Sequence, residues 1–326
     1  MDLRLALYQL ADEHRLDAHA ATRLEALAGL GDEPGTLARR LPLGLAALAA
    51  ALLGLGLIFW IAANWATLGR FGRFAVLQGA LLSMGLAALW RPALRAPLAL
   101  VVLLATGALF AYFGQTYQTG ADPWQLFALW AALMLPLAWG LRSELLWTPW
   151  VLVAFAAVSL WIQAHTGHQW RVEPDDLAVH LVGWIAALAI VFAMAAPGRR
   201  FTGAGTWALR AAATLAVVVI TITALGALFA RDIAAHYALG LLVLAAFGAA
   251  FVPVRSFDVF ALSAAALGLN TLLVAGLGRL LFEHSGSGDP IGRLFLLGLV
   301  AAGLLAASVS AVLRLARARV ATGAAQ

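Results

Sequence analysis

Ten apolar runs of about 20 residues each occupy most of this 326-residue chain, and no other feature restricts its fold as strongly. At about 1.5 Å per residue, a helix of that length crosses the roughly 30 Å hydrocarbon core of a bilayer. The composition agrees, because 63% of the residues are hydrophobic and only 11% are charged. We therefore predict an all-α, polytopic helical membrane protein. The ten predicted spans are residues 41–63, 73–90, 97–117, 123–141, 145–164, 177–196, 207–230, 234–252, 257–282 and 291–313.

Proline and aspartate mark where several of these helices begin. Pro97 falls in a first turn, where a missing backbone N–H costs nothing. Asp122 followed by Pro123 has the pattern of an N-cap and first helical residue, and Asp289 followed by Pro290 repeats it. These signals place the connections before the fourth and the tenth span.

The first 40 residues differ from the rest, because they are rich in charge and have a soluble pattern. Leu3, Leu7 and Leu10 recur at helical spacing, and Leu16 followed by Asp17 resembles the start of a second helix. We predict a helical hairpin over residues 1–40, a transmembrane domain over residues 41–314 and a tail over residues 315–326.

Arginine distribution predicts the orientation in the membrane. An even number of spans places both termini on one side, and twelve arginines fall on that side against six opposite. By the positive-inside rule both termini are cytoplasmic, in a bacterial inner membrane. The twelve are Arg39, Arg40, Arg91, Arg95, Arg142, Arg199, Arg200, Arg210, Arg255, Arg314, Arg317 and Arg319; the six are Arg70, Arg73, Arg171, Arg231, Arg279 and Arg293.

Several function classes are excluded by composition. The chain has no cysteine, which excludes disulfides, thiolate catalysis and cysteine metal sites. The sequence pI near 10.6 reflects arginines at helix ends rather than a nucleic-acid surface. We predict no cofactor, no bound metal and no nucleic-acid partner; the lipid bilayer is the expected environment.

Charge is almost absent inside the predicted spans, unlike in most proton- or sodium-coupled transporters. The deepest ionisable groups, His180, Arg210 and Arg279, lie within about one turn of a span end. Glu283 follows Arg279 by four residues, which predicts an interfacial ion pair. The other polar residues in the spans are neutral and are expected to form helix–helix hydrogen bonds. They are Gln78, Ser83, Thr106, Thr214, Thr221, Thr223, Asn270 and Thr271.

The stretch from Phe113 to Trp130, FGQTYQTGADPWQLFALW, gathers amide, hydroxyl and indole groups at the predicted outer surface. Neutral donors and acceptors beside indoles suit a neutral polar ligand, such as a sugar or a lipid head group. The alternative is a tight turn that satisfies its own backbone and anchors in the interface. The predicted ligand-binding residues are Asn64, Trp65, Gln115, Tyr117, Gln118, Asp122, Trp124 and Gln125; we assign no catalytic residue.

Two segments carry a family resemblance: IAANW (61–65) and GQTYQTGADPWQLFALW (114–130). They resemble the bacterial inner-membrane family catalogued as domain of unknown function 2157. The resemblance includes the N-terminal helical segment with its Leu16–Asp17 turn and extends to about Ala164. It implies a multispanning protein of unassigned activity, and it transfers no catalytic residue.

Three functional hypotheses remain open. The first is a carrier or receptor that binds a neutral polar or lipid-like molecule at the outward-facing site. The second is an accessory protein that recruits a cytoplasmic partner through residues 1–36. The third, which ranks last because no metalloprotease-type spacing supports it, is a membrane enzyme at the outer face. Its metal would be held by His165 and His168 together with Glu173, Asp175 or His284.

Overall fold

The computed structural model describes residues 3–28, 35–117, 120, 122–167, 172–230, 235–253, 255–283 and 290–323. Within these ranges the chain is helical and contains no strand, which confirms the predicted fold class. Nine described helices are long and apolar enough to span a membrane, and a tenth, α11, is apolar but shorter. The membrane helices are α3 (Gly35–Ala63), α4 (Trp65–Trp90), α5 (Arg95–Tyr117), α6 (Pro123–Leu141), α7 (Glu144–His165), α8 (Leu177–Met194), α10 (Thr206–Leu228), α11 (Ala235–Ala250), α12 (Val259–Glu283) and α13 (Pro290–Gly323).

The N-terminal unit contains the two predicted helices, α1 (Leu3–Glu13) and α2 (Ala18–Leu27), which contact each other. The backbone N–H of Ala20 donates to Oδ1 of Asp17 at 2.7 Å, which confirms the predicted N-cap of the second helix. Residues 29–34, between this unit and α3, lie outside the described part.

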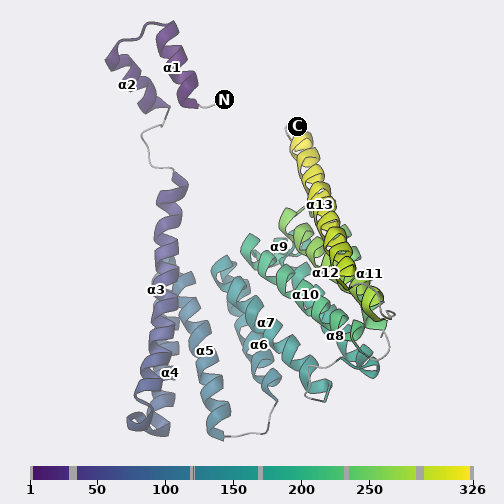
Figure 1. The fold of residues 1–326 in the computed structure, drawn as a ribbon. Coiled ribbons are helices and arrows are strands. Elements are labelled where there is room, and N and C mark those ends of the chain that lie inside the picture. The colour runs from purple at the N-terminus through teal and green to yellow at the C-terminus, as the bar shows by residue number, and fades with distance from the viewer. Residues whose placement is uncertain are drawn as a thin grey trace.

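The membrane helices run antiparallel in sequence order, and Figure 1 shows both termini at the same end of the array. We call the opposite end the distal end. It contains the last residues of α3, α5, α7, α10 and α12 and the first residues of the helices that follow them. The distal end is the side that the arginine distribution predicts to face outward.

Helix α10 forms the centre of the array, where it packs against α7, α8, α11 and α12. Its packed faces consist mainly of alanine, and Ala208, Ala212, Ala216 and Ala224 are fully buried. Small side chains allow backbones to approach closely, and in a membrane this van der Waals contact replaces the hydrophobic drive between helices. The alanines on these faces of α10 therefore allow its close packing against four other helices.

Two local features lie near helix ends: a break in α4 at Gly69 and the short connecting helix α9. Gly69 in α4 has φ of 59° and ψ of 173°, so the helix is broken there before it continues inward. Short helix α9 (Ala196–Thr202) connects α8 to α10 at the end opposite the distal end. There the indole N–H of Trp147 on α7 donates to the carbonyl of Thr202 at 2.8 Å. The Glu144 carboxylate accepts from the backbone N–H of Trp207 at the start of α10. These two bonds fix α7 against the α9–α10 connection.

The prediction that neutral polar residues bond between helices is correct for some positions and wrong for others. The amide of Asn270 on α12 donates to Oγ of Ser308 on α13 at 2.9 Å, and the Trp184 indole on α8 donates to Thr223 on α10 at 3.0 Å. By contrast, Thr106, Thr214 and Thr271 each donate to the carbonyl four residues earlier in their own helix. A threonine hydroxyl reaches its own backbone without help from a neighbour, whereas an asparagine amide extends further.

Candidate functional site

Most of the predicted ligand-binding residues lie at or near the distal end, but several serve the helix ends themselves. The side-chain amide of Asn64 donates to the carbonyl of Trp60 at 2.9 Å, within the end of α3. Asp122 is the N-cap of α6 and Pro123 occupies its first turn, as predicted. Gln118 and the side chain of Trp65 lie outside the described residues. Part of the polar stretch is therefore turn chemistry.

Trp124 and Gln125, in the first turn of α6, differ in their surroundings. Gln125 is exposed, whereas Trp124 is half-buried and its ring centroid lies 6.0 Å from that of His165 at the end of α7. His165 in turn stacks on Trp161, with centroids 4.4 Å apart, and its Nδ1 lies 2.8 Å from the Trp161 carbonyl. These rings anchor α6 to α7 near the interface.

Gln115 and Tyr117 line different cavities, although they are two residues apart. Gln115 is at the rim of a cavity of about 360 Å³ between α3, α5 and α6, which also contains Ile61 and Trp130. Tyr117 lines a groove of about 800 Å³ on the α4 side of α5. Two residues on a helix differ by about 200° around its axis, which explains the separation. The structure thus does not bring all the predicted residues to one cavity.

The groove with Tyr117 is lined by aromatic rings from two antiparallel helices, and we call it the aromatic groove. The Tyr117 ring centroid lies 4.7 Å from that of Phe113 and 6.2 Å from that of Phe74. The guanidinium of Arg70 lies 5.9 Å from the Tyr117 centroid, within cation–π distance. The lining residues are Phe71, Phe74, Ala75, Gln78, Leu109, Phe110, Phe113, Tyr117 and Leu129.

Sequence reasoning missed all of these groove residues except Tyr117. A signal was present, because Phe71, Phe74 and Gln78 are spaced at i, i+3 and i+7. Phe110, Phe113 and Tyr117 repeat this spacing in the following helix. Such spacing places each set on one helix face. What the spacing cannot give is that the two faces lie opposite each other.

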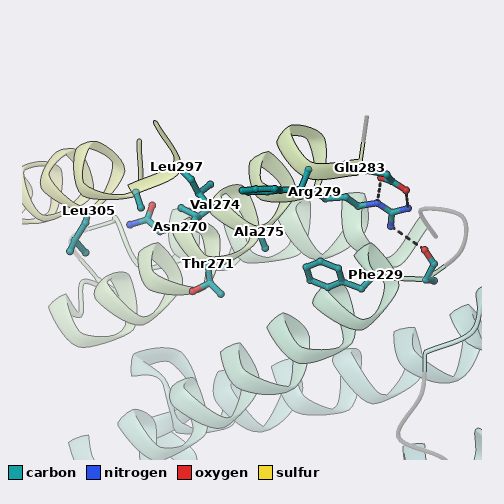
Figure 2. Close-up of a pocket in the computed structure, with 13 residues that line it drawn as sticks. Phe229, Asn270, Thr271, Val274, Ala275, Arg279, Glu283, Leu297 and Leu305 are labelled. Atoms are coloured by element: carbon teal, nitrogen blue, oxygen red, sulfur yellow. Dashed lines mark hydrogen bonds and ion pairs between the residues drawn. The ribbon is translucent and has the colours of Figure 1, made fainter. Parts of the chain in front are cut away.

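A cavity of about 950 Å³ lies between α12 and α13, and Phe229 at the end of α10 also lines it (Figure 2). Arg279 forms the predicted ion pair with Glu283, with Nη2 2.7 Å from Oε1, and its Nη1 donates to the Ala230 carbonyl at 3.1 Å. Figure 2 shows these groups at one end of the cavity and Asn270 near the other. The Arg279–Glu283 pair and the Asn270 amide are already hydrogen-bonded within the protein. This cavity therefore offers a ligand mainly apolar contact.

A third feature is a pair of buried histidines near the distal end, His180 on α8 and His236 on α11. Their exposed fractions are 3% and 0%, and Nδ1 of His180 lies 3.2 Å from Nε2 of His236. The same Nδ1 lies 3.0 Å from the carbonyl oxygen of Asp176. His180 also lines a cavity of about 430 Å³ between α7, α8 and α10. From the sequence, His180 was named only as an ionisable group near a span end, and its contact with His236 was not predicted.

The proposed outer metal site finds no support in the part of the chain that the structure describes. Within it, no three histidine, aspartate or glutamate residues are grouped closely enough to hold a metal ion. His168, and His284 as one of the three alternatives for a further ligand, lie outside the described residues.

Comparison with known proteins confirms the family resemblance over the first part of the chain. Residues 8–147 match the family described as predicted membrane protein (DUF2157). This region includes α3 to α6 and the aromatic groove. No curated protein and no solved structure matches the chain. The family description and the nine long apolar helices together establish an integral membrane protein.

Proposed function

We propose that this membrane protein binds or transports an amphiphilic molecule with a polar head group, through the aromatic groove at its distal end. One observation carries the proposal. Arg70 and Tyr117 lie together at the distal end of a groove whose walls, apart from Gln78, are otherwise aromatic and aliphatic. A polar head at the membrane surface and an apolar chain that extends inward match this arrangement.

The depth of the groove favours an amphiphile over a small sugar. Gln78 lies eight residues beyond Arg70 in α4, which is about 12 Å further into the membrane. Leu109 lies eight residues before Tyr117 in α5, at a matching depth. The exposed ring of Phe71, at 79%, leaves the groove open towards the side. A lipid-like molecule can therefore enter from the plane of the bilayer.

Arg70 also favours a head group with hydrogen-bond acceptors. Its guanidinium lies over the rings of Phe71 and Tyr117, at 5.4 and 5.9 Å. A guanidinium presents five N–H donors in one plane, and ring faces do not consume them as acceptors would. A hydroxyl, carbonyl or phosphoryl oxygen of a head group would complete this arrangement.

The membrane orientation belongs to the same proposal. The arginine excess at the termini supports a bacterial inner membrane with both termini in the cytoplasm. The aromatic groove would then open near the outer surface, where Trp60 and Tyr117, both about half-exposed, suit the interfacial belt.

The test is a thermal-shift measurement on purified protein with three lipids: phosphatidylcholine, phosphatidylglycerol and a monoglucosyl diacylglycerol. At least one lipid should raise the melting temperature of the wild type. Tyr117→Ala and Gln78→Leu should reduce that shift. Gln115→Ala is the matched control, because Gln115 lines the neighbouring cavity on the other side of α5. Absence of any shift, or equal shifts in Tyr117→Ala and Gln115→Ala, would reject the proposal.

A second role, as an accessory protein, is favoured by the N-terminal hairpin. Leu10, Leu16 and Leu27 are exposed at 47%, 37% and 81%, although they are large apolar residues on a unit outside the membrane array. Such side chains suit contact with a cytoplasmic protein. A defined protein that co-purifies stoichiometrically and is lost on deletion of residues 1–36 would support this role. A single-component purification of the full chain would count against it.

A further inference from the structure

The cavity beside His180 combines an apolar wall with a buried imidazole pair, and neither feature belongs to the aromatic groove. The cavity lies between α7 and α10, and His180 of α8 also lines it. Leu152, Val218 and Ile222 on its walls are exposed at 53%, 44% and 61%, so it is open to the bilayer. Its polar lining groups are Ser159, Thr166, His180 and Thr223.

Hydrogen-bond geometry assigns the proton on one nitrogen of His180. Nδ1 lies 3.0 Å from the Asp176 carbonyl, and a carbonyl oxygen only accepts. Nδ1 of His180 therefore carries a hydrogen, and Nε2 of His236, at 3.2 Å, lies within reach of the same N–H as a second acceptor. When both rings are neutral, Nε2 of His180 therefore carries no hydrogen, and its lone pair can accept a hydrogen bond.

The ring of His236 does not have a hydrogen-bond partner at each of its two nitrogens within the described residues. His236 is fully buried, and its Nδ1 has no hydrogen-bond partner among the described residues. Leaving a buried polar nitrogen unsatisfied costs roughly 1–3 kcal/mol. Two adjacent imidazoles inside a membrane domain are therefore an expensive arrangement, and apolar residues would pack there at lower cost. Such cost is usual where a group has a function.

Two of the other polar lining groups, Thr166 and Thr223, are already hydrogen-bonded within the protein, so His180 and the Ser159 hydroxyl are the polar groups that a ligand can contact. Thr223 accepts from the Trp184 indole at 3.0 Å and donates to the Val219 carbonyl at 2.9 Å. Thr166 donates to the Ile162 carbonyl at 3.0 Å. These two hydroxyls are engaged in the protein. Within the described part of the chain, both hydrogen-bond contacts of His180 involve Nδ1, which leaves Nε2 for the cavity.

We propose that this cavity binds a long-chain carboxylic acid, with its chain along α7 and α10 and its carboxyl group at Nε2 of His180. A protonated acid can donate its hydrogen to the lone pair of Nε2. Alternatively, the hydrogen resides on Nε2 and the carboxylate accepts it. In both states one proton is shared between the acid and the ring, so the pair enters the low-dielectric site without net charge. A volume of about 430 Å³ is within the range of small-ligand sites.

Two other chemistries fit the site less well. A head group with a permanent cation would meet only the lone pair of Nε2, without gaining an ion pair. An alcohol could donate a hydrogen bond to Nε2, but it is too weak an acid to transfer its proton to the ring and form an ion pair. A charge-assisted hydrogen bond is about twice as strong as a neutral one. The site should therefore prefer the acid over the alcohol of equal chain length.

The experiment uses the full chain in phosphatidylcholine nanodiscs and a palmitic acid with a diazirine in mid-chain. Photolysis followed by peptide mass spectrometry should locate adducts on residues 152–166 or 215–223. Unlabelled palmitic acid should compete at a concentration at least tenfold lower than hexadecanol, because charge assistance of about 1.4 kcal/mol corresponds to a factor of ten. Equal competition by the two, or adducts confined to other helices, would overturn the proposal.

Two variants test separately the role of the His180 ring and the role of the cavity beside it. His180→Phe keeps the ring volume but removes both nitrogens, and it should lower adduct yield at least tenfold. His165→Phe is the matched control. His165 also lies near the distal end, at the end of α7, but it stacks on Trp161 and does not line the cavity. If His180→Phe does not fold, Ala156→Leu is used instead, because it fills the cavity beside His180 and leaves both histidines in place. If the variant that folds gives the same adduct yield as the wild type, the proposed site is refuted. Adducts on α4 or α5 would concern the aromatic groove instead.

Discussion

Trp130 on α6 lies directly over Gly107 on α5, and its indole N–H donates to the carbonyl of Leu103 at 3.0 Å. A Cβ built on Gly107 would come within 2.3 Å of the Trp130 ring. The absence of a side chain at this position allows the indole to reach a backbone carbonyl of the facing helix. This contact explains why a tryptophan lies deep in a membrane span.

The first prediction follows from this contact. Gly107→Val should destabilise the protein by about 1–3 kcal/mol, because overpacking forces the indole away from its position. The measurement is unfolding of the purified protein in mixed micelles with increasing sodium dodecyl sulfate. Gly79→Val is the matched control in α4, where nothing lies within 4 Å of an added Cβ. Equal effects of the two substitutions would contradict the role of the Gly107 contact.

The second prediction concerns the Asn270–Ser308 hydrogen bond between α12 and α13. A double-mutant cycle with Asn270→Ala and Ser308→Ala should give a coupling free energy of about 0.6 kcal/mol, the average for hydrogen bonds between membrane helices. The donor–acceptor distance of 2.9 Å is favourable. A cycle of Asn270→Ala with Ser83→Ala should give no coupling, because Ser83 donates to the carbonyl of Ala80 in its own helix. Coupling near zero in the first cycle would show that the bond adds no stability.

The third prediction is at the end opposite the distal end, where the Glu144 carboxylate accepts from the backbone N–H of Trp207 in the first turn of α10. Glu144→Ala should lower stability by about 1 kcal/mol, since it leaves a helix N-terminus without its acceptor. Glu144→Gln should lose less, because the side-chain carbonyl oxygen remains. Thermal unfolding of the three proteins gives this ranking, and a melting temperature of Glu144→Ala equal to the wild type would disprove it.

The fourth prediction tests the orientation of the helices. The natural chain has no cysteine, so single cysteines can be introduced without background. In bacterial spheroplasts, Glu173→Cys at the distal end should react with a membrane-impermeant maleimide. Arg255→Cys, at the other end, should react only after permeabilisation. Both positions are exposed. The reverse labelling pattern would place the termini outside.

Much of the fold could be predicted because it depends on local properties. The length and hydropathy of each run determine that it crosses a membrane, and ten of these runs correspond to α3–α8 and α10–α13. Asp17 and Asp122 begin helices as predicted, because an N-cap depends on a few neighbouring residues. The Arg279–Glu283 pair was also predictable, since its members lie one helical turn apart.

The candidate sites could not be predicted to the same extent, because they depend on which helix faces meet. Gln115 and Tyr117 are close in sequence, yet they point to different sides of α5 and line separate cavities. Tyr117 and Phe74 are 43 positions apart, yet their rings lie 6.2 Å from each other. His180 and His236 come from helices that both pack on α10.

The sequence by itself determined that the chain is a helical membrane protein, that helices begin at Asp17 and Asp122, and which polar residues lie at each end. Hydrophobic length and helix capping act within a single helix, so no neighbour is needed to read them. Only the structure decided that α4 begins at Trp65 rather than at residue 73, and only the tertiary packing decided the aromatic groove, the cavity beside His180 and the contact of the two histidines. Between membrane helices the apolar side chains resemble lipid, so hydrophobicity does not select partners. Close contacts such as Gly107 with Trp130, and the alanine faces of α10, select them instead.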